Sequence, residues 1–214
     1  MRALGVGLAA CLLLAGCSAQ PPAGPGDSGV SATAGNSSSS AATVEGRVDV
    51  DTPALRALKA KALVQTCRPG TATGGLPAVT LPCLGGGPSV DLSTLRGPTV
   101  INLFAQWCGP CRAELPYYQA LHVKAKGRVR VLGIDYLDTQ PLAALELARR
   151  AGVTYPLLAD PSGTLRSGLG IRGLPGVVLL DAHGKVTDVE FRVFRSYTEL
   201  RALVRRKLGL SLPA

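Results

Sequence analysis

Two cysteines separated by two residues are the side chains of this sequence best suited to chemistry. Cys108 and Cys111 enclose Gly109 and Pro110. This spacing lets both sulfurs sit on the first turn of one helix, where they can form a disulfide and release it again. A thiolate at Cys108 would attack the disulfide of another molecule, and Cys111 would then resolve the mixed disulfide. The motif therefore predicts thiol–disulfide exchange.

The segments on either side of the cysteines predict a strand that leads into a helix. Residues 99–104 are β-branched and apolar, which is typical of a buried strand. After Cys108, apolar side chains recur at helical spacing at Leu115, Tyr118 and Leu121. Cys108 would then stand at the start of the helix, where unpaired N–H groups and the helix dipole stabilise a thiolate.

The stretch from Asn102 to Pro116 resembles the thioredoxin superfamily, and more narrowly the membrane-tethered thiol–disulfide oxidoreductases of the TlpA/ResA type. The resemblance implies that Cys108 is the nucleophile and that Cys111 is the resolving thiol. It also implies a substrate-contacting surface made by three residues around them: Trp107, Gly109 and Pro110.

Glu114 and Pro116 follow the cysteines in the predicted helix. By the resemblance, Glu114 is the acidic residue that tunes thiol protonation in this subgroup, whereas by residue type alone it is equally well a solvated helix residue. Pro116 would kink the helix. Plain thioredoxin carries a buried aspartate on the preceding strand, and Asn102 stands at that position here. An amide cannot accept a proton, so the resemblance moves this role to Glu114 or to water.

A second landmark of the superfamily is a cis-proline opposite the disulfide. Leu174 and Pro175 precede an apolar run at residues 177–180. The resemblance implies that Pro175 is the cis residue and that the backbone of Leu174 pairs with a bound substrate strand. Taken alone, Leu-Pro-Gly is only a turn signal. Gly176 departs from the small hydroxyl residue often found after this proline, which leaves the shape of the groove open.

The first forty residues have the layout of an export signal followed by a tether. An apolar run ends in Leu-Ala-Gly-Cys at Cys17, which resembles the lipobox of bacterial lipoproteins. By that resemblance, residues 1–16 are a signal peptide and Cys17 carries the lipid; an ordinary cleaved signal is the alternative. Residues 17–50 are rich in Ser, Gly and Pro and predict a flexible tether. We therefore expect the protein on the outer face of a bacterial plasma membrane.

Of the six cysteines, four remain once the signal is removed and one thiol carries lipid. Cys108 and Cys111 form the natural redox unit, so Cys67 and Cys83 pair by elimination. A structural disulfide between these two would remove about 3 kcal/mol of unfolded-state entropy, and a second redox centre is the alternative. Zinc is disfavoured because Cys67 and Cys83 do not form a second Cys-x-x-Cys knuckle. We expect neither a metal nor a cofactor.

Strands and helices alternate through the rest of the chain. We expect a strand at residues 129–135 and a helix at about residues 141–151, and this alternation favours an α/β sheet with crossover helices on its faces. The resemblance implies that the fold is thioredoxin-like, with a central mixed β-sheet flanked by helices. The interval between the cysteine helix and Pro175 is longer than plain thioredoxin needs. It leaves room for one extra strand–helix unit, which again resembles the membrane-tethered group. The thioredoxin-like domain would span residues 74–214, preceded at residues 51–73 by an N-terminal helix and a disulfide-stapled lead-in.

The chain is basic, with 23 Lys and Arg against 14 Asp and Glu and a net charge of +9. Ser196 begins a capping box that opens a last helix, and much of the charge lies on one face of this helix: Arg201, Arg205, Arg206 and Lys207. We interpret this face as solvated, with contact to anionic lipid headgroups as the alternative. Nucleic acid is disfavoured because an exported protein rarely meets it and the sequence has no recognition motif.

These features predict an extracytoplasmic, lipid-anchored protein disulfide reductase, and the resemblance suggests a role in cytochrome c maturation. Its partners would be exported proteins with thiols or disulfides and a membrane electron donor or acceptor, because a lipoprotein has no membrane-spanning electron path. The alternatives are a thiol oxidase, a thiol peroxidase and a non-catalytic binding lipoprotein. Peroxiredoxins place their reactive cysteine in a Pro-x-x-x-Thr-x-x-Cys setting, which does not precede Cys108.

Overall fold

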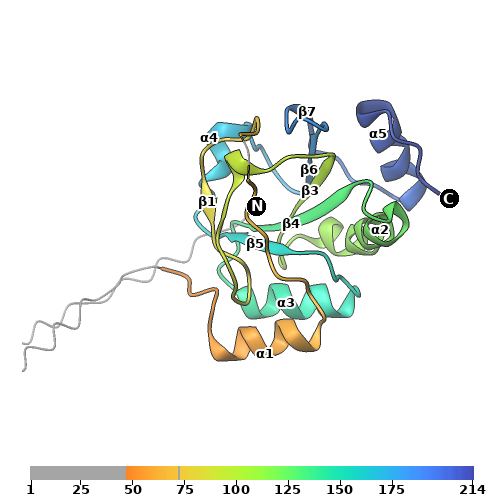
Figure 1. The fold of residues 1–214 in the computed structure, drawn as a ribbon. Helices are drawn as coiled ribbons and strands as arrows, with labels where there is room; N and C mark the ends of the chain where they lie inside the picture. The colour runs from red at the N-terminus through yellow and green to blue at the C-terminus, as the bar shows by residue number, and fades with distance from the viewer. Residues whose placement is uncertain (1–46, 72) are drawn as a thin grey trace, which may run out of the picture. The chain divides into compact units, whose positions relative to one another are not determined.

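The computed structural model describes residues 47–71 and 73–214 (Figure 1). The signal peptide expected at residues 1–16, the lipidation site Cys17 and most of the tether expected at residues 17–50 lie outside these ranges. Within them, every helix is too short or too polar to cross a bilayer.

A five-stranded mixed sheet forms the centre of the fold, with the strand order β5-β4-β3-β6-β7. Within this sheet β3, β4 and β5 are parallel to one another, β6 runs antiparallel to β3, and β7 runs antiparallel to β6. The strands are β3 (Thr99–Phe104), β4 (Arg130–Tyr136), β5 (Leu157–Asp160), β6 (Gly176–Leu180) and β7 (Val186–Glu190). Every residue of β3 is buried, which explains its nearly continuous apolar sequence.

Helices and two short strands surround the sheet (Figure 1). The helices are α1 (Pro53–Lys61), α2 (Gly109–Ala125), α3 (Pro141–Arg150), α4 (Leu165–Leu169) and α5 (Tyr197–Leu208). The antiparallel strands β1 (Thr80–Leu81) and β2 (Val90–Asp91) precede a 3-10 turn at Leu92–Thr94. Helix α1 packs on α3, and α2 packs on α5.

The side chains of β3 alternate between two apolar cores, as the pleat of a strand requires. Val100 and Phe104 face the core that α1, α2, α3 and α5 build on one side of the sheet. Ile101 and Leu103 face the second core, which α4 and the segment around residues 76–95 complete. Both faces of the central strand are therefore covered, so β3 holds the start of α2 in a fixed position.

Local capping interactions set where the helices begin. The Ser196 hydroxyl accepts the backbone N–H of Glu199 at 3.2 Å, and Glu199 Oε2 accepts the N–H of Arg195 at 3.0 Å. This is the expected start of α5. Thr52 caps α1 in the same way, through the N–H of Leu55 at 3.2 Å.

The predicted fold class is confirmed. The extra strand–helix unit is β5 with α4, between α2 and Pro175. The strand expected at residues 129–135 lies one residue later, and the helix expected to end near residue 151 ends at Arg150. Element ends are the least well specified part of a sequence pattern, because the last turn and the last ladder pair fray.

Candidate active site

Cys108 and Cys111 form a disulfide at the N-terminus of α2, with their Cα atoms 5.3 Å apart. Cys108 is the N-cap residue, and its Sγ accepts the backbone N–H of Cys111 at 3.3 Å. Cys108 is 4% exposed and Cys111 is 1% exposed, so Cys108 is the sulfur that a partner can reach more easily. The N–H donor and the helix N-terminus would both stabilise a thiolate on Cys108 after reduction.

The loop between β3 and α2 is fixed from two directions. The Gln106 N–H donates to Asp138 Oδ2 at 2.7 Å, and Arg112 Nε donates to the Gln106 carbonyl at 2.7 Å. Trp107 Nε1 donates to the Leu137 carbonyl at 3.0 Å while the side chain stays 52% exposed. Trp107 is therefore an anchored aromatic surface next to Cys108.

Two buried carboxylates, Asp135 and Asp138, lie beside this loop, and neither belongs to a motif that the sequence pattern singles out. Asp138 binds the loop with one oxygen and accepts the N–H of Gln140 at 2.9 Å with the other. Asp135 lies opposite Phe104 in the register of β3 and β4, and burial together with nearby Asp138 raises its pKa well above the usual range. Because the carboxyl ends of parallel strands meet at one edge of a sheet, polar residues at the end of β4 were the signal that could have identified them.

Glu114 is a buried acid one helical turn after Cys111. It is 1% exposed, and its Oε1 accepts the backbone N–H of Phe194. Its Oε2 has no hydrogen-bond partner among the residues that the structure describes. Burial raises the pKa of Glu114 to about 7, although the Phe194 N–H and Arg192 act in the opposite direction. The alternative of a solvated helix residue is therefore wrong, and this carboxyl can gain or lose a proton near neutral pH.

Two tyrosines and an asparagine complete the buried polar surroundings. The Tyr118 ring packs edge-on against Phe194 with centroids 6.4 Å apart, and burial raises the pKa of Tyr118, so its hydroxyl stays protonated. Asn102 is buried, and its Nδ2 donates to the Tyr155 hydroxyl at 3.4 Å. Asn102 thus acts here as a hydrogen-bond donor. An amide cannot accept a proton, so Asn102 does not take the role of the thioredoxin aspartate.

The peptide bond between Leu174 and Pro175 is cis, as expected. Pro175 directly precedes β6, where Gly176 pairs with Leu103 at the end of β3. This register places Pro175 at the same end of the sheet as the cysteine pair. A Cβ on Gly176 would lie 3.1 Å from Leu103 Cδ1 and 3.3 Å from Phe191 Cδ1. A side chain at this position would therefore press on Leu103 and Phe191, and a glycine avoids that contact.

The predicted pairing of Cys67 with Cys83 is confirmed, with Cα atoms 5.8 Å apart and both residues buried. Cys83 also forms an isolated bridge with Leu158 of β5. The disulfide therefore joins the segment after α1 to the edge of the sheet where β5 lies.

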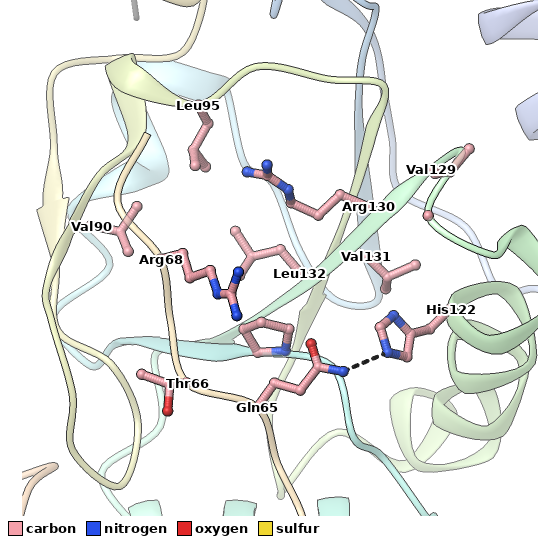
Figure 2. Close-up of a pocket in the computed structure, with 12 residues that line it drawn as sticks. Gln65, Thr66, Arg68, Val90, Leu95, His122, Val129, Arg130, Val131 and Leu132 are labelled. Atoms are coloured by element: carbon pink, nitrogen blue, oxygen red, sulfur yellow. Dashed lines mark hydrogen bonds between the residues drawn. The ribbon is translucent and has the colours of Figure 1, made fainter. Parts of the chain in front are cut away.

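A pocket of about 340 Å³ lies away from the cysteine pair of α2 (Figure 2). Its wall includes Arg130, Val131 and Leu132, the first residues of β4, whereas the loop before α2 meets the other end of that strand. Gln65 and His122 lie next to each other on its wall and form a hydrogen bond, with their Nε2 atoms 3.1 Å apart. Neither Cys108 nor Cys111 lines this pocket.

A metal centre has no obvious place in residues 47–71 and 73–214. No three His, Cys, Asp or Glu side chains gather there in the way that a metal site requires.

Comparisons with known proteins extend these observations. A model of the AhpC/TSA family matches residues 74–189. The chain is 34% identical over 113 residues to the thiol:disulfide interchange protein DsbE of Pseudomonas fluorescens biotype C. It is 30% identical over 104 residues to the thiol-disulfide oxidoreductase ResA of Bacillus thuringiensis strain Al Hakam. These two matches cover 52% and 48% of this chain.

A solved structure shows the same arrangement of elements. The crystal structure of a secreted thiol-disulfide isomerase from Corynebacterium glutamicum aligns with a TM-score of 0.53 and 26% identity, over 63% of this chain and 83% of that one. The two curated relatives are matched over 62% and 60% of their length, which is less than two thirds.

Proposed function

Because this chain belongs to the AhpC/TSA family, we propose that it is a thiol–disulfide oxidoreductase whose redox-active group is the Cys108–Cys111 pair. The observation that carries the proposal is the position of this disulfide at the N-terminus of α2, with Cys108 Sγ already accepting an N–H. The names of the relatives DsbE and ResA describe the same chemistry.

In the reducing direction, the exchange runs in two steps. The Cys108 thiolate attacks one sulfur of a substrate disulfide, and the other substrate sulfur leaves as a thiolate that takes up a proton. Cys111 then loses its proton and attacks Cys108 Sγ, which breaks the bond to the substrate. The released substrate sulfur takes up a proton, so the substrate has gained two electrons and two protons. One of these protons balances the proton that Cys111 lost and the other comes from solvent, and the Cys108–Cys111 disulfide remains.

Glu114 would take the proton of Cys111 in the second step. It lies one turn further along the same helix, its Oε2 has no partner among the described residues, and burial raises its pKa to about 7. A base with a pKa near the working pH is the most effective one for such a transfer. Asn102, at the position of the aspartate in thioredoxin, cannot replace it.

The substrate would meet a shallow surface around the disulfide. Trp107, Gly109 and Pro110 are exposed, and a Cβ on Gly109 would meet no atom within 4 Å. The backbone of Leu174, before cis Pro175, would add a strand-like contact to an extended segment of the substrate. A surface of this kind fits exposed disulfides in exported proteins rather than a small molecule held in a deep pocket.

We place the protein outside the cytoplasm, held at the membrane by a lipid on Cys17. The lipobox-like segment and the Ser-, Gly- and Pro-rich stretch after it support this placement. The related isomerase from Corynebacterium glutamicum is described as secreted. In these surroundings a reductase needs a membrane electron donor, and apocytochrome c is one class of exported substrate to test.

We favour the reducing direction because the Gly-Pro spacer is that of thioredoxin, whose potential is about −270 mV, against about −120 mV for the oxidant DsbA. The test is to equilibrate the protein with glutathione and dithiothreitol redox buffers and to quantify the two Cys108–Cys111 states. A potential near that of thioredoxin supports a reductase, whereas a potential near that of DsbA supports a thiol oxidase.

A thiol peroxidase is the other enzyme class that this fold supports. The setting before Cys108 lacks the Pro-x-x-x-Thr-x-x-Cys pattern. Consumption of hydrogen peroxide by the reduced protein at a rate no greater than that of a free thiol would exclude this alternative. A pair that cannot be cycled at all would favour a binding module.

A further inference from the structure

A buried lysine donates a hydrogen bond to the second disulfide. Lys59 lies in the last turn of α1 and is 6% exposed. Its Nζ is 3.0 Å from Cys83 Sγ and 2.6 Å from the Gly86 carbonyl. Lysine is almost never buried unless a partner balances its charge. The contact between Lys59 and Cys83 therefore needs an explanation beyond packing.

No carboxylate in the described part of the chain pairs with Lys59. Asp51 is the acid that faces it, but Asp51 is bound by Arg56 at 2.7 Å. Helix α3 packs on α1; its one acid, Glu146, pairs with Arg149 at 2.9 Å, and its remaining charged residue, Arg150, is a cation. Burial consequently lowers the pKa of Lys59, with only partial compensation from Asp51.

The sulfur of Cys83 has a second donor. The backbone N–H of Cys67 points at Cys83 Sγ from 3.3 Å. A disulfide sulfur is a poor acceptor, whereas a thiolate accepts strongly and carries the charge that a buried ammonium lacks. Two donors, one of them cationic, therefore suit a Cys83 thiolate better than a Cys83 disulfide sulfur.

The sulfur of Cys67 has the opposite surroundings. Its Sγ lies 3.2 Å from the Leu157 carbonyl oxygen, which can only accept. In the disulfide this sulfur has no hydrogen to give, whereas a thiol at Cys67 would donate to Leu157. The fold thus provides an acceptor for one sulfur and donors for the other, the pattern that a thiol beside a thiolate requires.

We propose that Cys67–Cys83 is a second redox couple, whose reduced form is a Cys67 thiol and a Cys83 thiolate paired with the Lys59 ammonium. The reductant is a dithiol. One of its sulfurs attacks Cys67 Sγ, and Cys83 leaves as a thiolate. The second sulfur of the reductant then attacks the first and releases Cys67, which takes up one proton. The dithiol loses two electrons and two protons, the protein keeps two electrons and one proton, and one proton enters solution.

The direction of attack follows from the surroundings of the two sulfurs. A thiolate that is already stabilised leaves faster, which favours attack at Cys67 rather than at Cys83. The pocket in Figure 2 borders the segment that carries Cys67, because Gln65, Thr66 and Arg68 line it. Both sulfurs are buried, so a small dithiol is the reductant to test first.

The test measures how the reduction equilibrium depends on pH. The full chain is equilibrated with reduced and oxidised dithiothreitol between about pH 6 and about pH 8, where free thiols stay mostly protonated. Acid quenching, alkylation and mass spectrometry then give the reduced fraction of each cysteine pair separately. Because one proton is released, we expect the equilibrium constant for Cys67–Cys83 to rise about tenfold per pH unit, with the circular dichroism of the fold unchanged.

Lys59→Met is the decisive variant, and Lys61→Met, at an exposed lysine of the same helix, is its matched control. Without the ammonium, both cysteines end as thiols, so the constant should become independent of pH. It should also fall at least tenfold below the wild-type value at about pH 8. Lys61→Met should behave like the wild type.

Two results would overturn the proposal. One is a wild-type constant that does not change with pH, a measurement that needs no variant to fold. The other is reduction of Cys67–Cys83 only together with loss of the folded circular dichroism signal, as expected for a purely structural disulfide. The same mass spectra report the Cys108–Cys111 pair separately. Failure of the proposal for Cys67–Cys83 is therefore distinguishable from failure of the proposed exchange at α2.

Discussion

Glu114 accepts the backbone N–H of Phe194, 80 residues further along the chain, and keeps its other carboxylate oxygen without a partner among the described residues. This contact connects the segment before α5 to the helix that begins with the redox cysteines. It removes Glu114 from solvent without neutralising it. The raised pKa of Glu114 is therefore a property of the assembled fold and has consequences for both stability and catalysis.

The first consequence concerns stability against pH. The pKa of Glu114 rises from an ordinary 4.5 to about 7 in the folded protein. The folded state therefore holds the proton more tightly, so this contribution is fully present below about pH 4.5 and is lost as the pH rises through about 7. The free energy of unfolding should fall by on the order of 3 kcal/mol across this window.

Glu114→Gln should abolish that part of the pH dependence, because an amide keeps the acceptor for Phe194 and has no proton to lose. Denaturant unfolding of the oxidised protein at several pH values measures how the free energy of unfolding depends on pH. Glu146→Gln, at a partly exposed glutamate paired with Arg149, is the control and should leave the change of unfolding free energy with pH the same as in the wild type. A wild-type curve that is flat between about pH 5 and about pH 8 would contradict the assignment.

The second consequence concerns the resolving step. If Glu114 takes the proton of Cys111, Glu114→Gln should prolong the lifetime of the mixed disulfide on Cys108 by about a hundredfold near pH 7, the lower end of what general base catalysis contributes. Rapid acid quenching followed by mass spectrometry measures that lifetime. The deficit should shrink as the pH rises and Cys111 ionises without help. An unchanged lifetime would leave Glu114 with a structural role only.

Gly176 gives a test of the packing next to Pro175. A serine Cβ there would lie 3.1 Å from Leu103 Cδ1 and 3.3 Å from Phe191 Cδ1. We expect Gly176→Ser to reduce the free energy of unfolding by about 1–3 kcal/mol, the usual range for overpacking a core. Gly173→Ser is the matched control, because a Cβ at Gly173 would meet nothing within 4 Å. Equal stability of the two variants would show that the strand end has room for a hydroxyl residue.

Asp138 gives a test of how the loop before α2 is held. Asp138→Ala would leave the N–H groups of Gln106 and Gln140 without their acceptor. Loss of bonds to a charged acceptor should cost about 2 kcal/mol of stability, and exchange at Cys108 should slow because the loop loses its anchor. The same substitution removes the charge next to Asp135 and should lower the pKa of Asp135. Thermal unfolding would measure the loss of stability, and an exchange assay would measure the slower reaction at Cys108.

Local patterns were sufficient for the elements that carry the cysteines. The apolar run of β3 and the capping box at Ser196 depend on neighbours within a few residues, so the sequence alone identifies them. The pairing of Cys67 with Cys83 followed from counting, since the other two cysteines form their own unit.

Contacts between distant segments could not be predicted in the same way. The burial of Glu114 requires Phe194, which reaches α2 only after four more strands have been laid down. Asp135 and Asp138 meet the cysteine loop because β4 pairs with β3 in one particular register. The contact of Lys59 with Cys83 depends on how α1 packs against the turn near Gly86. No periodicity in the sequence reports any of these.

Trapping the mixed disulfide tests the central claim most directly. The full chain carrying Cys111→Ser, incubated with an oxidised protein substrate, should accumulate a covalent complex through Cys108 that dithiothreitol releases. The full chain carrying Cys108→Ser should form none. Release of substrate thiols at the wild-type rate by both variants, with no covalent complex in either, would contradict exchange at the N-terminus of α2.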